Sequence, residues 1–243
     1  MRRRIWGYSI ILLLILAGLC MVTRKDKRTA ETEATIEQKL CKLLQDRESL
    51  IDYAADEKRI YAIVSSSGNR EYGDYLMVFL QQGDRSYERE YSNDFSDLKP
   101  WKLELADIDG DGRRDILTAV RKTTHYDSVE KNRFFIFDYI DGKLVKKWTG
   151  SQIAGTWKDF YAKDYLPMKG EEVLFISQTE EGRERLGIYY WFKFGFLLLA
   201  QSEDYEKIEE LRFTEDNQLQ INCSKDKENW IELTVKSGTI IRR

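Results

Sequence analysis

The sequence is poor in the residues that build thiol, zinc or histidine chemistry. Its 243 residues include three cysteines, one histidine and two prolines. No Cys-x-x-Cys pair or histidine cluster is present to hold zinc. A Ser-His-Asp or Cys-His mechanism would have to use His125, which lies in a polar stretch, and no Gly-x-Ser-x-Gly elbow accompanies it. We therefore expect His125 to be an exposed loop residue.

The charge pattern argues against nucleic acid as a partner. The net charge is −3, and Lys, Arg, Asp and Glu are interspersed along the chain without a basic face or arm. Glycoside hydrolysis by a pair of carboxylates remains a possible activity. The sequence gives it little support, because any two of its 42 Asp and Glu residues could form such a pair. Aromatic residues make up 13% of the chain, which predicts a folded domain with a sizeable core.

Four carboxylates are crowded into the segment Asp107-Ile-Asp-Gly-Asp-Gly-Arg-Arg-Asp115. Carboxylates this close repel one another unless a cation lies among them. Calcium suits such a loop, since it takes six to eight oxygen ligands and accepts backbone carbonyls. We expect Asp107, Asp109, Asp111 and Asp115 to bind it through their side chains and Arg113 through its carbonyl. The alternative is an acidic hairpin turn that binds no metal.

The residues after this loop distinguish between kinds of calcium site. An EF-hand requires a bidentate Glu at the twelfth position, where this chain has Thr118, and a helix after it. Here the loop runs into the apolar, β-branched segment Ile116–Val120, which predicts a buried strand. An Asp-x-Asp-Gly-Asp-Gly-x-x-Asp loop before a short strand resembles the FG-GAP or VCBS-type repeat of β-propellers, also found in integrin α chains. The resemblance implies a propeller-type fold, often with calcium.

Paired features recur about every fifty residues, as in propeller blades. Each unit has an apolar strand followed by a hairpin whose turn contains glycine. These features predict a mainly β fold, a small β-propeller of about four degenerate blades, with an open or sandwich-like arrangement as the alternative. The predicted strands are Tyr61–Val64, Ile116–Val120, Val173–Ile176 and Leu219–Cys223, and the turn glycines are Gly83, Gly142, Gly195 and Gly238.

The acidic loop has a decayed copy one unit later. A shift of 57 residues places Asp164 and Glu172 at the positions of the first and last aspartates, whereas Leu166 and Met168 replace two central ones. Residues from about 100 to 200 are similar to bacterial membrane-anchored proteins with degenerate VCBS-like repeats, on the strength of Trp101, Lys147–Ser151 and Tyr190–Phe196. Trp101 and Trp157 begin the two units, and we expect both to lie between blades.

The N-terminus predicts a membrane segment. Basic residues flank an almost uncharged run from Ile5 to Thr23, which as a helix spans about 28 Å, close to the thickness of a bilayer core. A cleaved signal peptide is the alternative, but the bulky Leu19 before Cys20 disfavours cleavage. The predicted localisation is the cell membrane, single-pass, with the main domain extracytoplasmic; an intracellular orientation is the alternative.

Three regions follow from these patterns. Residues 1–28 form the anchor, residues 29–54 a tether and an amphipathic helix that begins at Thr35, and residues 55–243 the β-repeat domain. Two cysteines outside the anchor, Cys41 and Cys223, form either a disulfide or two free thiols. The apolar run Phe192–Ala200 is short and contains a lysine, which favours a buried hairpin over a second membrane contact.

The predicted function is a membrane-anchored extracytoplasmic binding or interaction module with a structural calcium site. Its partners would be the membrane, through the N-terminal helix, and an extracellular protein or glycan. The binding surface would lie on loops such as residues 66–74 and 122–132. The alternative is an extracytoplasmic hydrolase that acts on polysaccharide or peptide.

Overall fold

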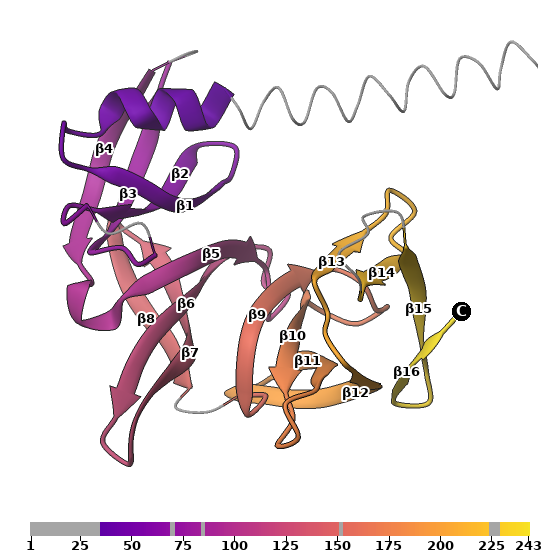
Figure 1. Cartoon of the computed structure of the whole chain (residues 1–243). Helices are drawn as coiled ribbons and strands as arrows, with labels where there is room; N and C mark the ends of the chain where they lie inside the picture. Colours follow the sequence, from indigo (N-terminus) through magenta and orange to yellow (C-terminus); the bar gives the residue numbers. More distant parts are fainter. Residues whose placement is uncertain (1–34, 69–70, 84–85, 151–152, 224–228) are drawn as a thin grey trace, which may run out of the picture. The chain divides into compact units, whose positions relative to one another are not determined.

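A computed structural model describes residues 35–243, apart from 69–70, 84–85, 151–152 and 224–228 (Figure 1). The chain divides into two compact parts, Met1–Asp46 and Arg47–Arg243. Within the described residues the first part contributes one helix, over residues 35–43. The second part, hereafter the β-domain, consists of strands and one 3-10 turn, Ser96–Leu98. The fold is therefore mainly β, as the sequence predicts.

The β-domain contains four consecutive antiparallel meanders of four strands each. The first meander comprises β1 (Ser49–Ala55), β2 (Arg59–Ser65), β3 (Tyr75–Gln82) and β4 (Ser86–Asp94). The second comprises β5 (Pro100–Ala106), β6 (Asp115–Thr124), β7 (Asp127–Ile140) and β8 (Lys143–Gly150). The third comprises β9 (Thr156–Lys163), β10 (Glu172–Gln178), β11 (Glu184–Phe192) and β12 (Gly195–Tyr205). The fourth comprises β13 (Glu210–Phe213), β14 (Leu219–Asn222), β15 (Trp230–Lys236) and β16 (Thr239–Arg242).

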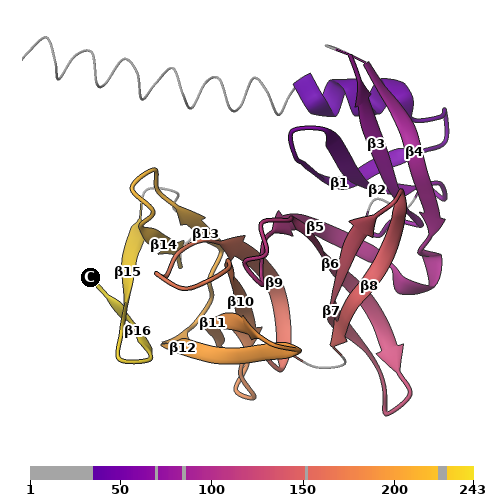
Figure 2. The same ribbon diagram turned by 180° about the vertical axis from the view of Figure 1, so that it is seen from behind.

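The sheets are curled and do not form a clear four-bladed propeller (Figures 1 and 2). The first two meanders are separate four-stranded sheets. The last two are joined into one eight-stranded sheet, because β16 pairs with β12 in parallel through Gln201 with Thr239 and Ser202 with Ile240. The described sheets therefore do not show the predicted closure into a small four-bladed propeller.

The predicted strands and hairpins are confirmed. The four apolar runs are the second strands of the meanders, β2, β6, β10 and β14, and each predicted hairpin joins the third strand to the fourth. Two hairpin turns follow the expected chemistry closely: Asp141 and Gly142 have φ of 50° and 75°, and Ser237 and Gly238 have φ of 51° and 78°. Positive φ at both central residues matches the twist of the flanking strands.

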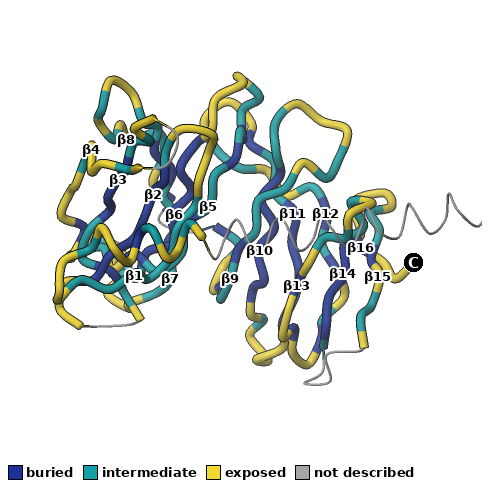
Figure 3. Tube along the Cα trace, turned by 90° about the horizontal axis from the view of Figure 1, so that it is seen from above, coloured by how far each residue is buried: buried dark blue, intermediate teal, exposed yellow. Residues whose placement is uncertain are grey.

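The second strands of the two interior meanders, β6 and β10, are buried on both faces along most of their length, because successive meanders pack against each other (Figure 3). Along β6, Ile116 faces the core shared with the first meander, and Leu117 faces the core shared with the third. Along β10, Val173 belongs to the same core as Leu117, whereas Leu174 faces the fourth meander. This is why these strands read as continuous apolar runs instead of alternating ones.

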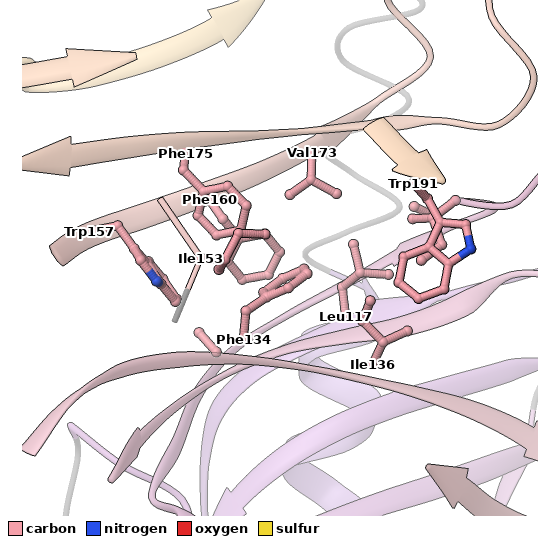
Figure 4. Close-up of a cluster of buried hydrophobic side chains, with 12 residues drawn as sticks. Leu117, Phe134, Ile136, Ile153, Trp157, Phe160, Val173, Phe175 and Trp191 are labelled. Carbon is pink, nitrogen blue, oxygen red and sulfur yellow. The ribbon is translucent and has the colours of Figure 1, made fainter. Parts of the chain in front are cut away.

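Aromatic side chains fill the core between the second and third meanders (Figure 4). Phe134 from β7 contacts Trp157 and Phe160 from β9 and Phe175 from β10, in edge-to-face geometries with ring centroids 4.9 to 6.5 Å apart. Such pairs add about 0.5–1.5 kcal/mol each beyond the apolar area they bury. This core packs the second and third meanders against each other.

Two predictions about the N-terminal region need correction. The helix ends at residue 43 instead of about residue 54, since Ser49–Ala55 forms β1, so the β-domain begins before residue 55. The predicted anchor, residues 1–28, lies outside the described residues. Where the structure describes the chain, no helix has the length and apolar character needed to cross a membrane. The described residues thus give no support to the predicted single-pass membrane localisation, and it is not carried further. Cys41 and Cys223 are free thiols, as one of the two alternatives expects, but that alternative has both buried, whereas Cys41 is exposed and Cys223 half-buried.

Candidate functional site

The acidic loop connects β5 to β6 in the second meander. Its first apolar residue, Ile108, is fully buried in the aromatic core and anchors the loop. Asp115 is the first residue of β6, pairs in register with Ala106, and is only 1% exposed. The loop between them turns outward through Gly110 and Gly112, whose φ angles are 67° and 86°. Both glycines of the loop therefore have the positive φ angles that a tight turn requires.

Three of the four predicted aspartates gather in this loop. Asp107, Asp109 and Asp115 each place a carboxylate oxygen within 4.8 Å of the others. Asp107 also accepts the N–H groups of Asp111 at 2.9 Å and Gly112 at 2.8 Å, which fixes the turn. The side chain of Asp111 instead forms an exposed ion pair with the guanidinium of Arg113, at 2.6 Å.

A lysine that the sequence analysis missed lies among these carboxylates. The Nζ of Lys147, on β8, is 2.7 Å from Asp109, 2.6 Å from Asp115 and 3.8 Å from Asp138. Burial raises the pKa of Asp115 to about 7, and its bond to Lys147 opposes that rise. Burial lowers the pKa of Lys147, but hydrogen bonds to Asp109 and Asp115 outweigh it and raise the pKa overall. The loop therefore has a cation of its own.

This arrangement fits a calcium ion incompletely. Calcium requires six to eight oxygens, whereas here Lys147 takes one oxygen each of Asp109 and Asp115, and Asp111 is paired with Arg113. A divalent ion would have to displace the Lys147 ammonium. Calcium at this loop, with Arg113 supplying a carbonyl, stays a prediction.

The decayed copy of the loop has the predicted position. Ala106 pairs with Asp115 and Lys163 pairs with Glu172, so the two meanders share a register at a shift of 57 residues. Glu172 is fully buried and accepts the N–H groups of Tyr165 at 3.1 Å and Leu166 at 3.0 Å. Its role matches that of Asp115, which accepts the N–H of Ile108.

The acidic loop rests directly on its copy. The backbone N–H of Glu171 donates to the carbonyl of Asp107 at 2.8 Å, and the Glu171 carboxylate accepts the N–H of Asp107 and pairs with Arg114. Gly170 makes this approach feasible: its φ is 89°, and a Cβ there would lie 2.4 Å from the carbonyl oxygen of Ile108. The two loops thus form one structural joint between meanders.

A second group of side chains gathers where the first strands of three meanders bulge. The ladder β1–β2 skips one residue between Leu50 and Asp52. The ladder β5–β6 does so between Pro100 and Lys102, and β9–β10 between Trp157 and Asp159. The bulged residues are therefore Ile51, Trp101 and Lys158. A bulge redirects a side chain out of the regular pleat, and bulges are frequent beside functional sites.

The three bulged residues line one pocket of 340 Å³. The remaining lining residues come from the β2–β3 connection and from β6 and β7: Glu71, Tyr72, Arg121 and Asn132. The Nε1 of Trp101 is buried and has no hydrogen-bond partner among the described residues. An indole N–H is a donor only, and burial without an acceptor costs free energy. The predicted binding loops, 66–74 and 122–132, contribute Glu71, Tyr72 and Asn132.

Polar bridges fix the strands around this pocket. The Asp52 carboxylate accepts the N–H of Leu103 at 2.7 Å, and the Nζ of Lys102 donates to Asp159 at 2.7 Å. Burial raises the pKa of Asp52, and the N–H groups of Leu103 and Tyr53 oppose that rise. Asp52, Lys102 and Asp159 occupy the same position after each bulge, so one repeated position links β1 to β5 and β5 to β9.

The remaining sequence candidates have simpler roles. His125 is exposed in the β6–β7 turn, as predicted. Trp101 and Trp157 lie between meanders with ring centroids 6.1 Å apart, but the ladders align Trp157 with Pro100, not with Trp101. The predicted burial of Phe192–Ala200 is wrong in part: the run is a hairpin, but Phe194 is 82% exposed.

Comparison with known proteins gives a likeness in fold. No family model matches the chain, and no curated protein matches it either. A crystal structure from Bacteroides uniformis, provisionally described as a 6-phosphogluconolactonase, is similar with a TM-score of 0.52 and 12% identity. The match covers 80% of this chain and 53% of that one, so this chain spans about half the length of that protein. A protein of the same description from Bacteroides fragilis matches with a TM-score of 0.41 and 12% identity, over 78% of this chain and 67% of the other.

These findings correct the predicted function. The fold is shared with a protein of another description. The described residues also hold no helix suited to a membrane. The membrane-anchored extracytoplasmic binding module is therefore withdrawn as the function, and so is its alternative, an extracytoplasmic hydrolase for polysaccharide or peptide. Calcium binding at the acidic loop stays a prediction.

Proposed function

We propose that the β-domain binds a small polar metabolite in the pocket lined by Ile51, Trp101 and Lys158. We further infer that its meanders are related as blades of an open, propeller-type repeat. Support for the second inference comes from the shared cores between successive sheets and from the adjacency of β1 to β5 and of β5 to β9.

The main support for the proposed pocket is that the same bulge recurs in three meanders. A single bulge would be explained by local twist, but the same position bulges in three meanders and all three residues line the same pocket. A volume of 340 Å³ lies at the lower end of the range of about 300–1,000 Å³ for small-molecule sites. A ligand the size of a hexose or a hydroxy acid fits this space.

The fold likeness supports a sugar-sized ligand. The similar protein is described by a name that refers to a phosphorylated sugar lactone. We propose binding, not hydrolysis, for this chain, because Glu71 is the one carboxylate among the described lining residues and it accepts the O–H of Tyr72 at 2.6 Å. General-base catalysis needs a group within reach of the reacting water.

Tryptophan fluorescence tests the proposal. The full-length chain is titrated with hexose-sized polar compounds, including glucose, sorbitol, gluconate and glucose 6-phosphate. We expect at least one to change the emission of wild type, and the change to disappear in Trp101→Phe. Trp230→Phe is the matched control, because Trp230 stacks with Arg212 away from the pocket. A response that persists in Trp101→Phe and disappears in Trp230→Phe would place the ligand elsewhere.

A further inference from the structure

We propose that the ligand of this pocket is an anion, a carboxylate or a phosphate monoester, held by Arg121. The inference rests on the proposed function and specifies its ligand class. It follows from which polar groups around the pocket are already bonded within the domain and which retain bonding capacity.

Arg121 retains most of its bonding capacity. Its guanidinium has five N–H donors, and its two side-chain contacts are long: 3.5 Å to Asn132 and 3.7 Å to Glu130. Glu130 has a closer partner, since Lys99 binds it at 2.6 Å. The guanidinium of Arg121, which lines the pocket, therefore has no close acidic partner among the described residues.

Lys158 contributes its aliphatic stem and not its charge. Its Nζ donates to Glu184 at 2.6 Å and to the carbonyl of Ile208 at 2.5 Å. The carboxylate of Glu184 also accepts the N–H of Ile208, so the lysine is held within a closed set of bonds. The positive charge available to a ligand is therefore that of Arg121.

The other polar groups position Arg121 and complement it. The side-chain amide of Asn132 donates to the carbonyl of Trp157 at 2.9 Å, which directs its oxygen toward Arg121. Asn132 also pairs with Arg121 across β6 and β7. Trp101 lines the same pocket, but its Nε1 is buried, so the donor that a ligand can reach is the guanidinium of Arg121. Glu71 is the one acidic side chain of the described lining, and its carboxylate accepts the O–H of Tyr72. The charge of Arg121 suits an acceptor-rich anion, because a planar guanidinium fits carboxylate and phosphate oxygens in pairs.

Matched ligand pairs and an arginine series test the proposal in the full-length chain. Gluconate is compared with sorbitol, and glucose 6-phosphate with glucose, by isothermal titration calorimetry. Wild type, Arg121→Gln, Arg121→Lys and the control Arg89→Gln are measured. Arg89 suits as control because it lies on β4, is half exposed and contacts Glu48 only at 3.9 Å. Melting temperature confirms that each variant is folded.

We expect an anionic member of a pair to bind wild type about tenfold or more tightly than its neutral match. Arg121→Gln should remove that preference, Arg121→Lys should retain part of it, and Arg89→Gln should keep it. The two pairs distinguish a carboxylate from a phosphate ligand. If the neutral and anionic members bind equally and the Trp101 response is intact, the anion inference fails while the proposed function stands. If no probe produces a Trp101-dependent response, the proposed function itself fails.

Discussion

The Nζ of Lys147 lies 2.6 Å from the Oδ1 of Asp115, and this contact joins the last strand of the second meander to the start of its second strand. Asp115 is fully buried and Lys147 largely so. The acidic loop is therefore closed by an ammonium group of the chain itself, and its stability should depend on that group.

Replacing Lys147 by Met should lower the free energy of unfolding by about 3 kcal/mol, since removal of one partner leaves a buried carboxylate without its counter-charge. Urea denaturation measures the change. Lys146→Met is the control, because Lys146 is exposed on the same strand and should shift the value by less than about 0.5 kcal/mol. Equal effects of the two substitutions would show that the Lys147 contact contributes nothing specific.

Calcium should stabilise Lys147→Gln more than wild type. In the variant an ion would not have to displace the ammonium from Asp109 and Asp115. We expect the melting temperature of the variant to rise by several degrees between chelator and millimolar calcium, a shift of about 1 kcal/mol or more, and that of wild type to rise less. Asp109→Asn in the same background should abolish the rise. No calcium response in either protein would rule out the predicted metal site.

Glu172 should make stability depend on pH. Burial raises its pKa above 4.5, because the carboxyl is desolvated and one oxygen has no partner among the described residues. A raised folded-state pKa means that the folded protein binds the proton more tightly. The contribution of Glu172 to stability is then present below pH 4.5 and lost as the pH rises through its folded pKa. Unfolding measured from pH 4 to 7 should show a steeper loss for wild type than for Glu172→Gln; parallel curves would contradict this.

Gly170→Ala should weaken the joint between the two loops. The substitution adds backbone strain at φ 89° and a clash with the Ile108 carbonyl, so we expect a loss of about 2–3 kcal/mol in unfolding free energy. Gly182→Ala separates the two effects, because Gly182 has φ 77° and a Cβ added there would meet no atom within 4 Å. The control should lose about 1 kcal/mol. A loss no greater than that of the control would show that the loops adapt to the added methyl group.

Local patterns predicted the strands and hairpins well, because alternation, apolar runs and turn glycines act over a few residues. The match of Asp115 to Glu172 also followed from the sequence, since both begin a buried strand after a loop of equal length. Lys147 could not be placed, because its approach to Asp115 depends on the β7–β8 register and the irregularity between Ile136 and Phe137.

The pocket could not be predicted from the sequence either, because it also depends on how the strands pair. Ile51, Trp101 and Lys158 share neither residue type nor polarity, so no motif marks them, and the hydrogen-bond ladders show that all three are skipped residues. The exposure of Phe194 was missed because a hairpin tip and a buried strand have the same apolar composition. The pocket, by contrast, depends on contacts between segments distant in the sequence.

The repeated bulge allows a side chain to be replaced while the strand pairing around it stays the same. The bulged residue lies outside the ladder pairing, so its side chain can be replaced without breaking a strand-to-strand match. Apolar, aromatic and basic side chains already occupy the three equivalent positions. Point substitution at these positions could therefore diversify ligand preference within one architecture, and the bulges are a natural starting point for engineering new binding specificities.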